Sequence, residues 1–155
     1  MAFDGIVIAN LAKELNHKLA DGRITKIAQT ESDKLLLTIK KSISSPEQKT
    51  IRTQNRLVIS VNPSLPLLYL TQENQNAPLQ APTFCMVLRK HLNNCKINLI
   101  EQIGLERVLC MHLEHLNEMG DYCRKKLYIE LMGKHSNIIF CDENDQIIDS
   151  IKHIS

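Results

Sequence analysis

Residues 96–131, KINLIEQIGLERVLCMHLEHLNEMGDYCRKKLYIEL, decide the kind of fold that this chain adopts. Apolar residues recur there at every second position, with a break at Gly104. From Tyr122 to Leu131 the odd-numbered residues form one face and the even-numbered residues form the other. Because the side chains of a strand alternate between its two faces, this period of two predicts strands. Further turns at Gly133 and over 142–146 extend the pattern, so the second half predicts an antiparallel meander.

The first half of the chain adds two helical patterns. Asp4 is a good N-cap, apolar residues follow it at helical spacing, and Gly22 provides a stop. These features predict a first helix over 5–20. Pro82 opens a second apolar pattern of helical period, which runs to Cys95. We therefore expect a second helix that begins at Pro82.

Short runs of aliphatic and β-branched residues lie between the two helical patterns. They predict four strands separated by polar or proline-containing turns, over 23–29, 34–40, 56–61 and 67–71. The stretch 41–49 is polar and predicts a loop. With the meander, these elements predict an α+β domain, an antiparallel β-sheet or sandwich with two helices.

Length and composition exclude several classes of protein. Of the 155 residues, 43% are hydrophobic and 23% are charged, which is the balance of a globular domain. No apolar run approaches the roughly 18 residues of a membrane span, and the first residues do not resemble a secretory signal. We expect a cytoplasmic protein with no membrane partner. The chain stops at Ser155 directly after an apolar strand, so we also expect it to be a piece of a larger multidomain protein.

The cysteines predict neither disulfides nor a metal site. They are odd in number and widely spaced: Cys85, Cys95, Cys110, Cys123 and Cys141. A disulfide framework needs pairs, and a structural zinc site usually shows closely spaced ligands. The potential metal ligands that lie close together in sequence do not share a face, because strand alternation places His115 opposite Cys110 and His112. We expect reduced thiols, no metal and no cofactor.

The charge pattern leaves two interpretations open. The net charge of +2 is small, but short basic clusters stand at 89–91, 124–126 and 134–135, and Arg23 and Lys26 lie near the front. If several of these share one face, they form a positive patch that neutralises phosphates. The alternative is an ordinary solvated surface of mixed charges. Composition alone favours the solvated surface.

Six motifs together identify a family. The strings MAFDGIVIANLAKELN, GRITKI, PTFCMVLRKHL, GLERV, ELMGKHSNII and IIDSIKH resemble, in order and over essentially the whole chain, the N-terminal domain of the NFACT family of ribosome quality-control proteins. The resemblance implies a module that binds tRNA and a large ribosomal subunit obstructed by peptidyl-tRNA. It recruits alanyl-tRNA for tailing of the stalled chain, while the ribosome supplies the chemistry, so we expect no enzyme. The implied fold is similar to the N-terminal domain of formamidopyrimidine-DNA glycosylases.

The first candidate binding motif is Gly104-Leu105-Glu106-Arg107. The family pattern places an acidic residue, commonly Asp, before an Arg, and the resemblance ties this pair to tRNA recruitment. An Arg stacks on an unpaired base or forks onto a phosphate, and a carboxylate accepts hydrogen bonds from a base edge. Glu106 is one methylene longer than the usual Asp. Without the resemblance, the pair reads as ordinary surface charge.

The second candidate motif lies at the turn that Gly133 allows. We expect polar side chains to project from its tip and clasp a phosphate of the tRNA: Lys134, His135, Ser136 and Asn137. As a bare hairpin turn, the same residues need no function.

A third set of residues supplies candidate contacts to the RNA backbone. Arg89 and Lys90 belong to the second helix, near solvent, and Arg23 and Lys26 belong to the first strand. RNA contact and simple solubility explain these four cations equally well.

Two other function classes compete with RNA binding. A glycosylase of the related fold attacks with an N-terminal proline, whereas removal of Met1 here exposes Ala2, so the attacking amine is absent in the form that chemistry uses. An adhesion protein is the other alternative, with fibronectin as its partner, following an older name of the family. The chain shows no signal, anchor or disulfide pattern that supports it.

Overall fold

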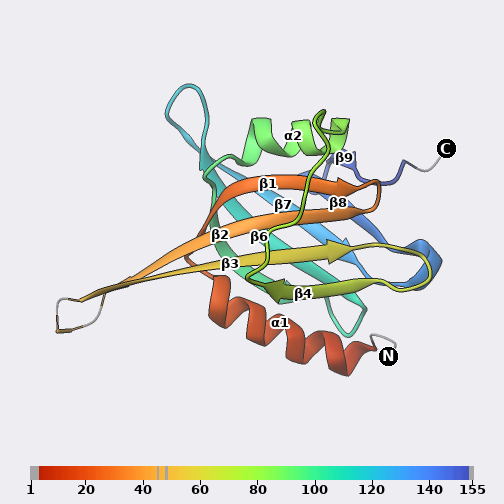
Figure 1. Cartoon of the computed structure of the whole chain (residues 1–155), viewed down its shortest axis with the longest axis horizontal. Coiled ribbons are helices and arrows are strands. Elements are labelled where there is room, and N and C mark those ends of the chain that lie inside the picture. Colours follow the sequence, from red (N-terminus) through yellow and green to blue (C-terminus); the bar gives the residue numbers. More distant parts are fainter. Residues whose placement is uncertain (1–3, 45, 48, 154–155) are drawn as a thin grey trace.

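The computed structural model describes residues 4–44, 46–47 and 49–153. Within these residues, two α-helices and nine strands follow one another (Figure 1). In chain order they are α1 (Gly5–Leu19), β1 (Arg23–Glu31), β2 (Lys34–Ser44), β3 (Thr50–Ser60), β4 (Leu67–Thr71), α2 (Thr83–Leu92), β5 (Lys96–Gln102), β6 (Val108–Leu116), β7 (Tyr122–Glu130), β8 (Asn137–Asp142) and β9 (Ile147–Ser150). A short 3-10 turn, Gly133–His135, lies between β7 and β8.

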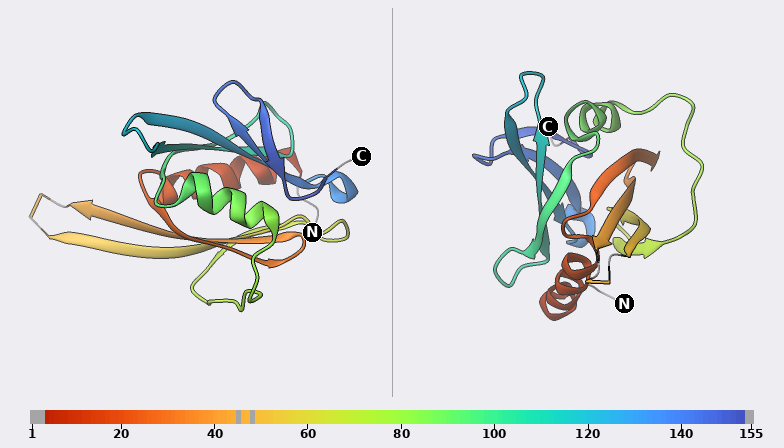
Figure 2. Two further views of the ribbon diagram at one scale, coloured as in Figure 1. Left: turned by 90° about the horizontal axis from the view of Figure 1, so that it is seen from above. Right: turned by 90° about the vertical axis from the view of Figure 1, so that its left-hand side faces the viewer.

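All nine strands form one antiparallel sheet in the order β4-β3-β2-β1-β5-β6-β7-β8-β9. Strands β1 and β5 are paired only through Arg23 and Lys96. The sheet folds at this narrow joint into two facing layers, β1–β4 and β5–β9 (Figure 2). Helix α1 packs against β5 and β6, and α2 packs against β1, β6 and β9, so the helices close opposite sides of the sandwich. The predicted α+β class and sandwich are confirmed.

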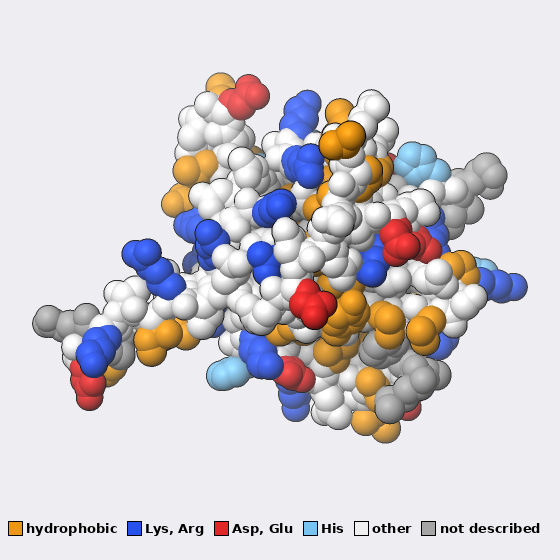
Figure 3. All heavy atoms as spheres, viewed as in Figure 1, with side chains coloured by type: hydrophobic (Ala, Val, Ile, Leu, Met, Phe, Trp, Pro, Cys, Tyr) orange, Lys and Arg blue, Asp and Glu red, His pale blue; other side chains and the backbone are white. Residues whose placement is uncertain are grey.

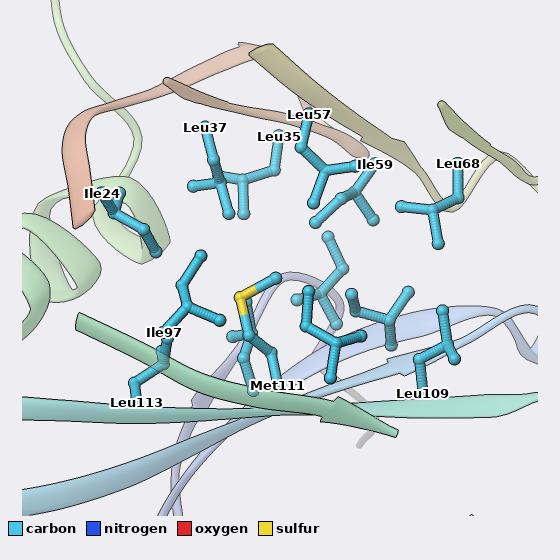
Figure 4. Close-up of a cluster of buried hydrophobic side chains, with 14 of the residues drawn as sticks. Ile24, Leu35, Leu37, Leu57, Ile59, Leu68, Ile97, Leu109, Met111 and Leu113 are labelled. Carbon is cyan, nitrogen blue, oxygen red and sulfur yellow. The ribbon is translucent and has the colours of Figure 1, made fainter. Parts of the chain in front are cut away.

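The core lies between the two layers, where aliphatic side chains of one layer face those of the other (Figure 4). Leu35, Leu37 and Ile59 come from the first layer, and Leu109 and Met111 come from the second. Each is at most 1% exposed, and burial of one such side chain stabilises the fold by about 1.5–3 kcal/mol. In β7 the period of two read from the sequence marks the core face, whereas in β5 a register shift after Ile97 leaves Leu99 39% exposed.

The ends of the helices differ slightly from the prediction. Asp4 caps α1 as expected, because its Oδ1 accepts a hydrogen bond of 2.8 Å from the Val7 amide. The residue that takes a left-handed conformation after α1 is Asp21, at φ +70°, and not Gly22. Helix α2 ends at Leu92, earlier than expected, because the Asn94 amide donates to the carbonyl of Ile24 in β1.

The hairpin between β2 and β3 is longer than the sequence indicates. The loop predicted over 41–49 is wrong for its first four residues, since β2 continues to Ser44, and β3 begins at Thr50, six residues before the predicted strand 56–61. Register pairs such as Ser42 with Arg52 extend the ladder beyond the core, and the hairpin projects as an arm (Figure 1). Its side chains are largely exposed, so no apolar period marks the strands. Neither helix in the described ranges is long and apolar enough to cross a membrane.

Candidate nucleic-acid interface

A narrow turn, Gly104–Arg107, joins β5 to β6. The Ile103 amide donates to the Val108 carbonyl at 2.9 Å, and the Glu106 amide donates to the Ile103 carbonyl at 3.1 Å. Gly104 has a φ of +57°, the left-handed region that glycine adopts without strain. The backbone conformation of the turn is thus set by its own hydrogen bonds.

The start of α1 braces this turn from one side. The side-chain amide of Gln102 donates to the carbonyl of Gly5 at 2.9 Å and to that of Glu106 at 2.8 Å. A Cβ atom placed on Gly5 would lie 2.6 Å from the carbonyl oxygen of Leu105, which is too close for any side chain. The helix therefore approaches the turn as closely as glycine allows.

The segment after β7 braces the turn from another side. The Leu131 amide donates to the Arg107 carbonyl at 3.0 Å, directly before the Gly133–His135 turn. Glu130 pairs with Val108 across β6 and β7. Burial, and then the charge of Glu106, raise the pKa of the Glu130 carboxyl. The structure thus brings the first two predicted motifs together at one end of strands β5–β8.

The side chains of Glu106 and Arg107 are exposed, and Leu105 beside them is 91% exposed. Within the described ranges, neither charged side chain forms a hydrogen bond or an ion pair. An unpaired guanidinium beside an unpaired carboxylate can contact both a phosphate and the edge of a base. The turn thus offers both groups on a backbone that is already ordered.

The second turn exposes only half of the residues expected at its tip. Lys134 and His135 are exposed, whereas Ser136 is 1% exposed and Asn137 is 5% exposed. The expectation that all four project from the tip is therefore wrong for Ser136 and Asn137. Strand β8 begins at Asn137, and the segment after β9 folds back over this position.

Asn137 fastens that returning segment to the sheet. Its Nδ2 donates to the Lys152 carbonyl at 3.1 Å, and its Oδ1 accepts from the amides of Ile138 at 2.9 Å and Lys152 at 3.1 Å. The side-chain amide is committed to these three backbone partners. Ser136 differs, because its buried hydroxyl has no partner among the described residues.

The third predicted set lies at the other end of the strands. Arg23 and Lys26 in β1 are exposed, as are Arg89 and Lys90 in α2. The Nε of Arg89 also donates to the Ile27 carbonyl at 2.8 Å. This carbonyl lies on β1 beyond the single pair that joins β1 to β5. Arg23 pairs with the first residue of β5, whereas the Glu106–Arg107 turn follows the last, roughly 20 Å away along the strand. The structure does not bring the first and third sets together.

Strand alternation divides the basic cluster at 124–126, because it places Arg124 and Lys126 on one face of β7 and Lys125 on the other. Arg124 lies 3.7 Å from Glu114, and Lys126 lies 3.0 Å from Asp145, so both charges are paired. The Tyr128 hydroxyl donates to Asp145 at 2.6 Å, and this bond, followed by that of Lys126, lowers the pKa of the Asp145 carboxyl. The sequence alone does not reveal these partners, which lie on β6 and in the turn between β8 and β9.

All five cysteines are free thiols in the structure, and burial raises the pKa of Cys95 and of Cys110 to about 12. His112 contacts Glu101 at 2.7 Å, while His115 lies on the α2 side of β6, as strand alternation predicts. In the residues that can be described, no three His, Cys, Asp or Glu side chains are grouped to hold a metal ion. The expectation about Ala2 lies outside the described residues.

Comparison with known proteins places this chain in a family. Residues 4–155 match the family described as NFACT N-terminal and middle domains. The chain is 40% identical over 156 residues to the protein named Rqc2 homolog RqcH of Bacillus subtilis, and 38% identical over 155 residues to that of Streptococcus pneumoniae. These alignments cover 100% and 99% of the chain but 26% of each relative. The chain thus spans about a quarter of the length of the curated relatives it matches.

Solved structures show the same fold at similar identity. The N-terminal domain of the fibronectin-binding protein PavA from Streptococcus pneumoniae has a TM-score of 0.87 at 37% identity, and covers 99% of this chain and 55% of that one. The N-terminal part of the fibronectin/fibrinogen-binding protein from Streptococcus suis has a TM-score of 0.88 at 34% identity, with the same coverage.

Proposed function

Because the chain belongs to the NFACT family, we propose that it is the tRNA-binding module of a ribosome quality-control factor. In this role it contacts a large ribosomal subunit obstructed by peptidyl-tRNA and recruits alanyl-tRNA for tailing of the stalled chain. The module positions RNA and catalyses no reaction. The relatives named Rqc2 homolog RqcH support this assignment.

One observation carries the proposal. Glu106 and Arg107, the acidic residue and Arg of the family motif, are exposed and unpaired within the described part of the chain. They stand on a turn whose backbone is already ordered by Gln102 and the Leu131 amide. A preordered turn loses little conformational entropy when it binds, so its contacts contribute more fully to affinity. Lys134 and His135 are exposed on the turn that follows Leu131, whose amide binds the Arg107 carbonyl, and they are the second candidate contact.

Substitution of Arg107 by Ala tests this role. We expect tRNA capture to weaken by roughly 1–3 kcal/mol, the scale of a lost stacking or bidentate contact. The measurement is the amount of tRNA that co-purifies with obstructed large subunits, at equal subunit occupancy. Arg124→Ala is the matched control, because Arg124 is an exposed cation already paired with Glu114.

Two substitutions of the neighbouring acid refine the test. Glu106→Asp restores the residue usual in the family, so we expect tRNA capture to be retained, whereas Glu106→Gln shows whether the negative charge is needed. Glu106 is exposed, so Glu106→Asp should leave the melting temperature unchanged and Glu106→Gln should change it only slightly. If Arg107→Ala retains full tRNA capture with an intact fold, the proposed role of this turn is wrong.

Fibronectin is the second candidate partner, because the solved neighbours are named as fibronectin-binding or fibronectin/fibrinogen-binding proteins. Surface plasmon resonance of the chain on immobilised fibronectin tests it. Saturable binding that survives Arg107→Ala and an excess of tRNA would support an adhesion role separate from the turn. Binding that tRNA abolishes would indicate only a shared attraction for charged surfaces.

A further inference from the structure

The outer face of the first layer is strongly positive, and the register of its strands explains why. Ala28, Leu36 and Val58 form a small buried cluster separate from the main core, so they mark the face of β1–β3 that points away from the core. Leu36 is paired with both Ala28 and Val58. Residues directly opposite one another in an antiparallel pair point to the same face, and so do residues two apart on a strand.

Four exposed cations occupy this face. Lys26 is paired with Thr38, two residues from Leu36, and Lys40 follows two residues later, paired with Arg23. Arg52 is paired with Ser42, the next outward position of β2. We call Arg23, Lys26, Lys40 and Arg52 the basic face. From Thr38 to Ser42 it extends about 13 Å along β2.

The basic face lacks the carboxylates that neutralise other cations of the molecule. Across the described ranges, none of its four members forms an ion pair. The only acidic residue within β1, β2 or β3 is Glu31, at the far end of β1, where it lies 3.8 Å from Lys34. On the outer face of the second layer, by contrast, Arg124 and Lys126 are both paired.

Arg89 extends the positive charge from α2, since its side chain reaches the Ile27 carbonyl of β1. Figure 3 looks onto this side of the molecule and shows Lys and Arg side chains gathered over α2 and over β1–β3. Unpaired cations held on a rigid sheet suit a polyanion whose charges repeat along its length. A single small anion would not engage cations that span this distance.

We infer that the basic face is a second RNA-binding site, which contacts the phosphates of a double-stranded RNA segment without reading its bases. The four cations can neutralise phosphates, whereas the one aromatic side chain described on this side, Tyr69, lies level with Val58 and away from Arg52. Base readout needs stacking or splayed bases, so cations without aromatic neighbours indicate backbone contact. The inference rests on the proposed RNA-binding role, but it uses none of the residues of the Glu106–Arg107 turn.

The two sites have different geometry. The Glu106–Arg107 turn follows the end of β5, and the basic face begins at Arg23, which is paired with the start of that strand. One RNA contact at each end of the module would fix its orientation as well as its position. The projecting β2–β3 hairpin, which carries Lys40 and Arg52, would lie along the helical segment.

The test uses the whole chain and a plain RNA duplex of about 16 base pairs, the length that spans two minor grooves. Lys26, Lys40 and Arg52 are all changed to Gln, and binding is followed by fluorescence anisotropy at about 50 and 200 mM KCl. Arg23 is left in place because it also donates to the Asn94 carbonyl. The matched control changes Lys13, Lys18 and Arg124 to Gln, which lowers the net charge equally on other surfaces.

We expect the triple variant to bind the duplex roughly tenfold more weakly at low salt. The slope of log affinity against log salt should fall by about 2.7 units, because three phosphate contacts are lost at about 0.9 units each. The control variant should keep most of the affinity and slope. Equal losses in the two variants overturn the inference, because they mean that net charge alone drives binding. Loss of binding only to vesicles of anionic phospholipid, with duplex binding retained, also overturns it.

Arg107→Ala in the same duplex assay separates this inference from the proposed function. We expect no change in duplex binding, because that side chain lies at the other end of β5. If Arg107→Ala leaves tRNA capture intact while the triple variant loses the duplex, the turn assignment fails and the basic face stands. If tRNA capture falls but the triple variant binds the duplex normally, the basic face fails alone.

Discussion

Two polar turns lie at the same end of strands β5–β8, and the sequence predicts exposed side chains for both. In the Gly104–Arg107 turn the charged pair is exposed, whereas the turn after Gly133 exposes Lys134 and His135 and buries the next two residues. The difference comes from a segment far along the chain, because Lys152 lies over Asn137 and is bonded to it. Polarity alone therefore does not identify a binding residue, since a buried amide can satisfy backbone groups instead.

Substitution of Asn137 by Ala should have the largest effect on stability. It removes three hydrogen bonds at a buried position and leaves their backbone partners unsatisfied, so we expect a loss of about 2–4 kcal/mol in the free energy of unfolding. Urea denaturation measures it. Asn144→Ala, at an exposed position, should cost little. If Asn137→Ala leaves the stability unchanged but impairs tRNA capture, Asn137 is a binding residue and not a buried clamp.

Gly5→Ala should displace the Gly104–Arg107 turn, because Gly5 packs against the backbone of that turn. The new Cβ would meet the Leu105 carbonyl oxygen at 2.6 Å, so the backbone must shift, and we expect a loss of about 1–3 kcal/mol in stability together with weaker tRNA capture. Gly120→Ala is the control, because Gly120 has a φ of +83° in open space at another turn. It should lower the melting temperature without changing tRNA capture. If Gly5→Ala retains tRNA capture, the close packing of α1 against the turn is not needed for binding.

Ser136→Ala should have the opposite sign to Asn137→Ala, although the two residues are neighbours. The Ser136 hydroxyl is buried with no partner among the described residues, so its removal should leave stability unchanged or raise it by up to about 1 kcal/mol. Ser150→Ala is the comparison, because its hydroxyl donates to the Lys152 carbonyl at 2.7 Å and should cost about 1 kcal/mol. A clear loss in Ser136→Ala would reveal a partner for that hydroxyl.

Glu106→Gln should produce the smallest effect, a change in the pH dependence of stability. The pKa of Glu130 is raised in the folded state by burial and then by Glu106. Its contribution to stability is therefore fully present below the unfolded pKa of about 4.3 and is lost as the pH rises through the folded value. Without the charge of Glu106, less stability should be lost between pH 4 and pH 7, as measured by urea midpoints. Glu118→Gln, on another turn, should leave the dependence unaltered.

Much of the fold follows from local patterns in the sequence. The N-cap at Asp4, the apolar period of α1 and the alternation from Tyr122 to Leu131 each involve residues within a few positions of one another. The β2–β3 arm was not predicted, because its strands are exposed on both faces and show no apolar period. Helix α2 ends early because the backbone of β1, distant in sequence, binds the Asn94 amide.

The sequence by itself determined the two helices, the period and core face of β7 and the Glu106–Arg107 motif, since each depends on neighbours along the chain. Only the tertiary structure decided that Asn137 is a buried clamp and that Lys26, Lys40 and Arg52 share one outer face. The physical reason is that cross-strand register joins residues far apart in sequence, and burial depends on which distant segment covers a position. A short stretch of sequence shows neither the cross-strand register nor the distant segment that covers a position.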